Sequence, residues 1–413
     1  MMSLQIIKKT SMKTILFFGA GAEHQIAIKL AKSMGYKVIA ADANSKAPGL
    51  KFADVAVVED IKDIDKMIAV GKKYKVDGVI VHAVEIPHIV SRVAKALGLP
   101  GIDPKVADRA TFKAQRIDAL EKAGLNVPEF VAVTTLAGAK KAAQKIGYPV
   151  VVKPTDNAGA RGVKCVENEE QLSDAMEEAL SFTHKPKVLI EQFLKGIEIS
   201  TEHLIYNGKI YTTGFGDRNY TRSQEFYPYF IEDGHNVPSI LPENVQKKII
   251  KACEKTIRAL GITWGVAKGD ILYTKEGTIY IIEMAARTSG GWFCAGTVPL
   301  ATGVHILKSL IKMAVGDPFD EADVLPTKNL WACQRYIIPT KSGKFVRLDG
   351  VAEAEKMPGV EMSVIFPPDK GEQVRKSVHN AERFGQIIAV GKTLDQATSC
   401  CEAAIAKIKI VLK

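Results

Sequence analysis

The sequence predicts an α/β protein of three domains, and three observations support this prediction. The chain has 413 residues, more than one hydrophobic core usually serves. Buried-strand and amphipathic-helix patterns alternate over residues 12–105, as in a parallel sheet covered by helices. After residue 325 the pattern changes to short strands and turns, followed by a helix rich in Ala, Ile and Lys. We therefore expect an N-terminal Rossmann-like parallel sheet (12–105), a central α+β domain (106–317) and a small α+β C-terminal lobe (325–413).

Composition and charge favour a folded enzyme or binding protein that acts on small anions. Hydrophobic residues make up 46% and charged residues 25% of the chain, both ordinary globular values. The net charge of +10 comes from basic residues scattered among acids, without the interleaved aromatic residues of a nucleic-acid platform. No apolar run reaches membrane-spanning length, and the six cysteines show no CxxC spacing. These features predict reduced thiols, a cytoplasmic location, and neither a nucleic-acid nor a membrane partner.

The first domain opens with a βαβ unit, "TILFFGAGAEHQIAIKLAKSMGYKVIAADAN", whose second strand ends at Asp42. Gly19 and Gly21 match the start of the dinucleotide motif G-x-G-x-x-G, but His24 stands where the third glycine belongs. An NAD-dependent oxidoreductase therefore remains only an alternative. Residues 1–11 precede this unit and do not enter the fold prediction.

The central domain opens with the helical pattern "DRATFKAQRIDALEKAGLNVP" and continues to a lysine behind an apolar strand. Lys153 follows "PVVV", where an ammonium group needs an anion or loses its proton. The next loop, "TDNAGARG", offers glycine-hinged N–H donors and the Arg161 guanidinium, the chemistry of a phosphate cover. A hairpin turn with a surface lysine fits this stretch, taken alone, equally well.

Four carboxylates follow on strand patterns. "VLIEQFLKGIEIS" is a strand that stops at Glu191 and resumes with Glu198. The exposed backbone between them can form hydrogen bonds with the edge of an adenine, and the Glu198 carboxylate can accept hydrogen bonds from ribose hydroxyls. Asp270 and Glu283 lie on two strands around the turn "KEGT", where an antiparallel hairpin lets them face one side and share a hard cation. Arg287 follows Glu283 at an even offset, which predicts the same strand and the same face.

In order and spacing, these motifs resemble the ATP-grasp superfamily of carboxylate–amine ligases. The resemblance implies ATP and Mg²⁺ (or Mn²⁺) as cofactors, a lid subdomain at about residues 125–190, and an acyl phosphate that an amine attacks. It implies that ADP and phosphate are released. The residues that it places on ATP are Lys113 and Lys153 at the phosphates, Asn157, Gly159, Arg161 and Gly162 in the lid, Glu191, Gln192, Phe193 and Leu194 at the adenine, and Glu198 at the ribose.

The resemblance also assigns Asp270 and Glu283 to the metal and Arg287 to the transferred phosphoryl group. Two features depart from the family pattern. The usual E-x-N-x-R reads "EMAAR", so Ala285 replaces the asparagine that normally helps to hold a second metal ion. The lid loop, "NAGARG", also has fewer glycines than the usual glycine run of the family.

At the substrate end, "YFIEDGHNVPS" and "EMAARTSGGW" look most like the ligases of this superfamily that join L-amino acids. Glu232 and His235, expected on a loop, would grip an amino group or a carboxylate together with Arg287, although a solvated loop histidine is the simpler interpretation. The turn expected to present open N–H groups and an aromatic wall to the substrate consists of Ser289, Gly290, Gly291 and Trp292. The partners implied are a small carboxylate and an amine, and the family also allows a homodimer. Alternatives are a glycinamide ribonucleotide synthetase-like or carbamoyl-phosphate synthetase-like enzyme, or a non-catalytic ATP-binding module.

Overall fold

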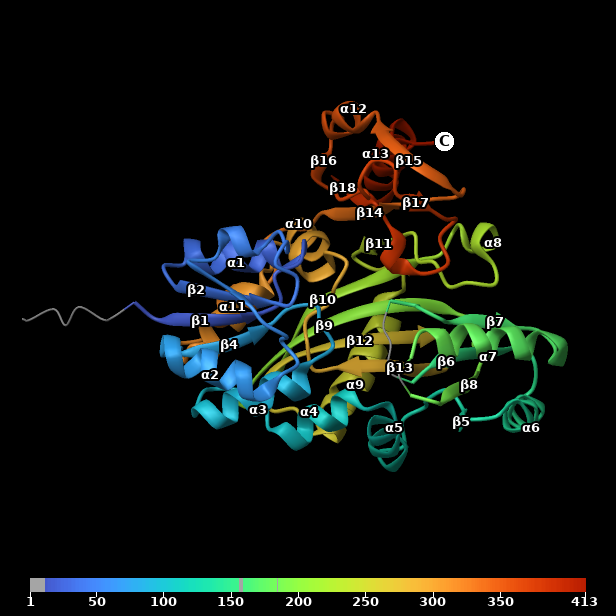
Figure 1. Cartoon of the computed structure of the whole chain (residues 1–413), viewed down its shortest axis with the longest axis horizontal. Helices are drawn as coiled ribbons and strands as arrows, with labels where there is room; N and C mark the ends of the chain where they lie inside the picture. The colour runs from blue at the N-terminus through green and yellow to red at the C-terminus, as the bar shows by residue number, and fades with distance from the viewer. Residues whose placement is uncertain (1–11, 156–158, 184) are drawn as a thin grey trace, which may run out of the picture.

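A computed structural model of the chain describes residues 12–155, 159–183 and 185–413 (Figure 1). Figure 1 shows the N-terminal domain and the lid at opposite ends of the molecule, with the central sheet between them and the C-terminal lobe beside it. No helix of the described residues is long and apolar enough to cross a membrane.

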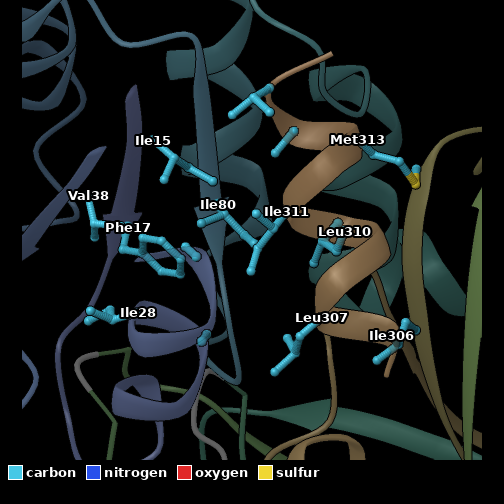
Figure 2. Packing of buried hydrophobic residues seen from close by; sticks show 14 of the residues in the cluster. Ile15, Phe17, Ile28, Val38, Ile80, Ile306, Leu307, Leu310, Ile311 and Met313 are labelled. Atoms are coloured by element: carbon cyan, nitrogen blue, oxygen red, sulfur yellow. The ribbon is translucent and has the colours of Figure 1, made fainter. Parts of the chain in front are cut away.

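The N-terminal domain is a parallel sheet of four strands in the order β3-β2-β1-β4, as the alternating pattern predicts. One face packs on α1 and α11, and the other on α2 and α3. Figure 2 shows α11, which comes from the central part of the chain, packing through Leu310 and Ile311 toward Phe17 and Ile80 of the sheet. The first domain is therefore fixed to the central one by a shared core. The elements are β1 (Thr14–Phe18), α1 (His24–Ser33), β2 (Lys37–Asp42), β3 (Val55–Val58), α2 (Ile64–Tyr74), β4 (Gly78–Val81), α3 (Pro87–Leu97) and α11 (Ile306–Ala314).

The helix predicted at the start of the central domain is two helices, α4 (Pro104–Thr111) and α5 (Lys113–Lys122). Phe112 between them has an extended backbone, with φ −85° and ψ 115°. The break makes Lys113 the first residue of α5. The prediction of one continuous helix was wrong because hydrophobic periodicity does not register a single extended residue.

The lid is an antiparallel sheet in the order β5-β8-β6-β7, with α6 and α7 packed on one face. Val151 of β6 pairs with Glu191 of β8, so Lys153, two residues further along β6, shares a face with Glu191. The elements are β5 (Phe130–Val133), α6 (Leu136–Ile146), β6 (Val150–Pro154), β7 (Lys164–Val166), α7 (Leu172–Ser181) and β8 (Val188–Gln192).

The central sheet has eight strands in the order β13-β12-β9-β10-β11-β14-β18-β16, and α9 covers part of one face. Its last three strands belong to the C-terminal lobe, so the sheet continues across the predicted boundary at residue 325. The strands are β9 (Ile197–Tyr206), β10 (Lys209–Asn219), β11 (Gly234–Val237), β12 (Gly265–Tyr273), β13 (Ile279–Ala285), β14 (Trp331–Ile337), β16 (Val360–Ile365) and β18 (Gly385–Gly391). The remaining α-helices are α8 (Ser223–Phe226), α9 (Glu243–Leu260), α10 (Val298–Thr302), α12 (Val351–Glu355) and α13 (Leu394–Lys407). A small separate sheet consists of β15 (Gly343–Asp349), β17 (Gln373–Val374) and β19 (Lys409–Leu412).

Candidate active site

A cleft of about 780 Å³ is lined by residues of both the lid and the central sheet. This volume lies in the range of typical small-molecule sites. Apolar side chains from both sheets form much of its wall, and charged groups gather among them. The apolar residues include Val151, Val163, Phe193, Leu272 and Ile282, and the charged ones include Lys153, Glu191, Glu198 and Arg218.

Within the cleft, the carboxylate of Glu191 bridges two lysines. One oxygen contacts Nζ of Lys113 and the other contacts Nζ of Lys153. Burial and the neighbouring Lys153 lower the pKa of Lys113 to about 7. Burial favours the neutral form of Glu191, but the two lysines outweigh it and keep the pKa of this carboxyl below its usual value. The cluster holds two lysines and one carboxylate, and an anion that enters the cleft would favour the charged form of Lys113.

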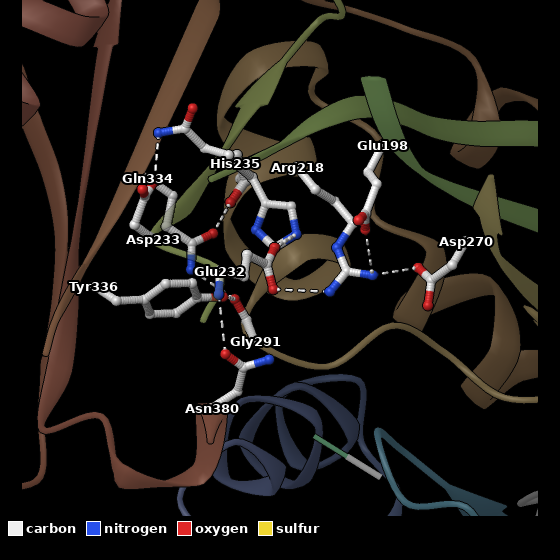
Figure 3. A network of polar contacts seen from close by, with 12 residues as sticks. Glu198, Arg218, Glu232, Asp233, His235, Asp270, Gly291, Gln334, Tyr336 and Asn380 are labelled. Atoms are coloured by element: carbon white, nitrogen blue, oxygen red, sulfur yellow. Dashed lines mark hydrogen bonds and ion pairs between the residues drawn. The ribbon is translucent and has the colours of Figure 1, made fainter. Parts of the chain in front are cut away.

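Arg218 on β10 lies at the centre of a buried charge network, shown in Figure 3. Its Nη1 is 3.1 Å from Oδ1 of Asp270 and 3.7 Å from Oε2 of Glu198, and its Nη2 donates to Oε2 of Glu232 at 3.1 Å. Burial opposes the charge of the guanidinium, but these carboxylates raise its pKa well above the usual value. Arg218 thus connects the residues predicted for the ribose, the metal and the substrate.

Glu232 and His235 form the next part of this network. Nε2 of His235 lies 2.7 Å from Oε1 of Glu232, and both side chains are buried. Burial favours the neutral carboxyl of Glu232, but Arg218 and His235 hold its pKa well below the usual range. His235 lies on strand β11, between β10 and β14, so both the predicted loop and the solvated histidine are wrong. A strand of four residues has too short a pattern to be recognised in the sequence.

Asp270 on β12 and Glu283 on β13 are directly opposite each other, which confirms the predicted hairpin pairing. Four cationic contacts surround them. Lys268 contacts Oδ2 of Asp270 and lies 3.6 Å from Oε2 of Glu283, while Arg116 lies 3.6 Å from Oε1 of Glu283 and Arg218 contacts Asp270 as above. Burial would raise the pKa of Glu283, but Lys268 and Arg116 are the main groups that lower it strongly. Glu283 is therefore held as a carboxylate.

Arg287 lies two residues beyond β13, which ends at Ala285, so its predicted place on that strand is wrong. The chain leaves the ladder here because Ser289 turns toward the buried Glu202 carboxylate, which accepts both its backbone N–H and its hydroxyl. The guanidinium is held from the N-terminal domain: its Nε donates to Oε2 of Glu85 at 2.6 Å. Its Nη1 donates to the carbonyl of Thr288 at 3.1 Å.

The turn after Arg287 is also held by the N-terminal domain. The Glu23 carboxylate accepts from the backbone N–H groups of Gly291 at 3.1 Å and Trp292 at 2.9 Å. Burial raises the pKa of Glu23 to about 7. The expectation of open N–H groups is wrong for Ser289, Gly291 and Trp292, because buried carboxylates accept them. The Trp292 indole stacks on Phe366 of the C-terminal lobe, with ring centroids 5.7 Å apart, so all three domains meet at this turn.

Comparison with known proteins identifies the family. The family model "D-ala D-ala ligase C-terminus" matches residues 119–292, and the model "L-amino acid ligase C-terminal domain 2" matches residues 335–413. The chain is an ATP-grasp ligase. This result confirms the resemblance and the α/β fold class, and it removes the oxidoreductase and the non-catalytic module from the alternatives.

Individual relatives of this ATP-grasp ligase differ in substrate. It is 29% identical over 293 residues to a D-alanine–D-alanine ligase of Geotalea uraniireducens, a match that covers 67% of this chain and 85% of that one. An L-amino acid ligase from Bacillus licheniformis superposes with a TM-score of 0.84 at 22% identity, over 97% of this chain and 99% of the other. A phosphoribosylglycinamide synthetase from Anaerococcus prevotii gives 0.74 at 23% identity, over 97% and 100% of the two chains. At these identities the two solved structures show the shared fold.

The structure brings most of the predicted site residues together. Gln192, Phe193 and Leu194 line the cleft beside Glu191 and Glu198. Around the lid loop, the carbonyl of Gly159 accepts from the backbone N–H of Asn380 in the C-terminal lobe at 3.0 Å. Burial lowers the pKa of the His379 ring, and the nearby Arg375 and Arg161 lower it further. Gly162 has a left-handed backbone, and Asn157 lies outside the described residues. Glu191 lies at the two lysines, whereas the resemblance assigns it to the adenine; its role stays a prediction.

The acids of this ATP-grasp ligase fit a magnesium ion. Carboxylate oxygens are the ligands that Mg²⁺ prefers, and the ion is usually held by one or two of them together with substrate phosphates. Oδ1 of Asp270 is buried and has no hydrogen-bond partner in the described residues, although Arg218 lies near it. No group of three or more His, Cys, Asp or Glu within the described ranges could hold a metal ion. Asp270 and Glu283 would therefore hold Mg²⁺ only together with nucleotide phosphates and water.

Proposed function

We propose that the protein is an ATP- and Mg²⁺-dependent ligase that activates the carboxyl group of an L-amino acid and joins it to the amine of a second metabolite. Lys113 and Lys153 bind the phosphates of ATP, and Asp270 and Glu283 hold Mg²⁺, which neutralises charge on the phosphate oxygens. The adenine occupies the apolar part of the cleft beside residues 192–194, and Glu198 accepts from the ribose.

The reaction has two steps in this proposal. An oxygen of the substrate carboxylate attacks the γ-phosphorus of ATP, the bond to the bridging oxygen breaks, and ADP leaves. The amine then attacks the acyl carbon, phosphate leaves, and the amine loses a proton, for which the Glu232–His235 pair is the proposed acceptor. Arg287 stabilises the transferred phosphoryl group by its fixed charge, because catalysis of such a transfer depends on positioning and charge neutralisation.

One observation carries this proposal: Lys153 of the lid, Glu283 of the central sheet and Arg287 are close enough to influence one another electrostatically. Lys153 of the lid and Arg287 from beyond β13 both lower the pKa of Glu283 on the central sheet. A triphosphate beside Glu283 would thus meet cationic groups from both sides. The amino-acid substrate is supported by the C-terminal lobe, whose matching model is that of L-amino acid ligases.

The products of the reaction test the mechanism. With ATP, Mg²⁺ and pairs of L-amino acids, we expect ADP and phosphate in equal amounts with the new amide. Chromatography of the spent nucleotide measures this ratio across the amino acids, singly and in pairs. AMP and pyrophosphate as main products would contradict the mechanism. A response only to glycine with phosphoribosylamine would favour the glycinamide ribonucleotide synthetase reaction, the alternative that shares the overall fold.

Nucleotide binding should take up protons at pH 8.5. The pKa of Lys113 is lowered to about 7 without nucleotide, so this side chain is mostly neutral at that pH. A polyphosphate beside it favours the ammonium form and raises the pKa, so binding adds up to about one proton. Calorimetry of ADP binding in two buffers that differ in ionisation enthalpy measures the uptake. Lys113→Met should remove it, and the same uptake in parent and variant would show that another group is responsible.

A further inference from the structure

Lys268 lies opposite Ala285, the position at which the chain departs from the metal-binding pattern of its family. The hairpin register pairs Lys268 of β12 with Ala285 of β13, and Asp270 with Glu283. Residues two apart on a strand, and residues opposite on neighbouring strands, share one face of a sheet. Lys268, Asp270, Glu283 and Ala285 therefore form one four-residue patch. The lysine stem stands opposite the alanine that replaces the asparagine of E-x-N-x-R.

The ammonium group of Lys268 is in contact with both metal-binding acids. It contacts Oδ2 of Asp270 and lies 3.6 Å from Oε2 of Glu283. Its side chain is only 12% exposed, so these carboxylates are its main counter-charges. A second cation that used the same two oxygens would meet the ammonium at close range, where like charges in a buried site repel strongly.

The other oxygens of the pair remain suited to one ion. Oδ1 of Asp270 is buried without a hydrogen-bond partner in the described part of the chain, but it lies 3.1 Å from Nη1 of Arg218, with which a cation would compete for this oxygen. The Glu283 side chain is 30% exposed. One hard cation can use these oxygens together with phosphate, while Lys268 stays beside Oδ2 of Asp270 and Oε2 of Glu283. Ala285 offers no ligand atom that could hold a second ion.

We propose that the Lys268 ammonium takes the place of one divalent cation, so that this ligase binds a single Mg²⁺ with its nucleotide. Lysine is a compact point charge with three donors, and it can neutralise two carboxylates at once. The inference rests on the proposed function, because it assumes that ATP phosphates complete the metal site. It assigns Lys268 as a positioning residue that fixes the two acids and sets the number of metal ions.

The number of Mn²⁺ ions bound with a non-hydrolysable ATP analogue tests this inference directly. Electron paramagnetic resonance of free Mn²⁺ gives the ions bound per protein, and calorimetry of the same samples gives the analogue bound. We expect one tightly bound ion in the parent and in Lys268→Arg, which keeps the charge. The double variant Lys268→Met with Ala285→Asn should bind two, with the second ion held at least tenfold more tightly than by the parent.

Two controls separate the charge from other effects. Ala285→Asn alone should still bind one ion, because the ammonium remains. Lys247→Met removes an exposed lysine on α9, 68% of whose side chain is accessible, and should also leave one ion. Thermal melting checks that each variant is folded. If the double variant does not fold, Ala285→Asn alone decides, because two tightly bound ions in that variant would overturn the role of the ammonium.

The outcomes distinguish this inference from the proposed function. Two tightly bound Mn²⁺ ions in the parent with the analogue in place would overturn the role of Lys268 and leave the ligase proposal intact. A single ion in the folded double variant would also overturn it. Failure of the parent to bind the analogue with any Mn²⁺ would overturn the proposed function, and the inference with it.

Discussion

Replacing Lys153 by methionine should lower kcat/KM for ATP by about 10²- to 10³-fold, equivalent to about 2.7–4 kcal/mol of transition-state stabilisation. Methionine keeps the length and apolar stem of lysine and removes the charge that meets the phosphates. The fold should not suffer, because Glu191 would keep Lys113 as its partner and one of two crowded ammonium groups would be gone. Initial rates of phosphate release and the melting temperature measure the two effects separately. Lys113→Met should behave in the same way.

The matched control for these variants is Lys145→Met on α6. This lysine also lies in the lid, but 73% of its side chain is exposed, and its partner Glu129 is half-exposed. Surface ion pairs of this kind contribute little, so we expect parental activity and stability. Glu191→Gln is the opposite test: it leaves two buried ammonium groups without a carboxylate and should lower the melting temperature. Parental turnover in both Lys153→Met and Lys113→Met would show that the phosphates bind elsewhere.

The sequence predicted those parts of the fold whose signal is local. The strand at Thr14–Phe18, the glycine turn and the strand that ends at Asp42 follow one another without interruption, and each is as expected. The hairpin that carries Asp270 and Glu283 was also predicted, because a short turn between two strands fixes which residues face each other. The break at Phe112 was not predicted, since only tertiary contacts decide whether one residue leaves a helix.

The residues that the sequence analysis missed act through partners distant in the chain. Arg218 stands in "GFGDRN", and nothing nearby in the sequence shows that it meets Glu198, Glu232 and Asp270. Glu23 follows the glycine turn, and its contacts with Gly291 and Trp292 are likewise distant in the chain.

Lys268 and Glu85 differ in whether a sequence pattern could have revealed them. Lys268 lies two residues before a predicted metal ligand, so strand periodicity alone could have placed it on the same face. Glu85 is separated from Arg287 by about half of the chain and meets it only because the ends of the N-terminal strands point at the central domain. No sequence pattern could have predicted that contact.

The contact between Glu85 and Arg287 leads to the second large effect. Arg287→Met should lower kcat by roughly 10³-fold or more, the usual cost of removing an arginine that stabilises phosphoryl transfer. The affinity for ADP should change little, since the nucleotide is held by Lys113, Lys153 and the cleft. Arg287→Lys should recover little activity, because an ammonium cannot bind Glu85 and the phosphoryl group with a planar fork of donors. Single-turnover formation of ADP measures the chemical step without product release.

Glu85→Gln separates the charge of Arg287 from its orientation. The amide keeps one acceptor oxygen for Nε of Arg287, now 2.6 Å from the carboxylate, but it removes the negative charge that fixes the guanidinium. We expect a smaller loss, about 10- to 100-fold in kcat, because a misplaced catalytic group costs up to about 10²-fold. Arg347→Met on β15 is the matched control, since 59% of its side chain is exposed and its guanidinium has an ion pair only with Asp349 among the described residues. If Arg287→Met retained more than about a tenth of the parental single-turnover rate, this arginine could not be the group that stabilises the phosphoryl transfer. The cationic groups near Glu283 would then have to be reassigned, with Arg116 and Arg218 as the candidates.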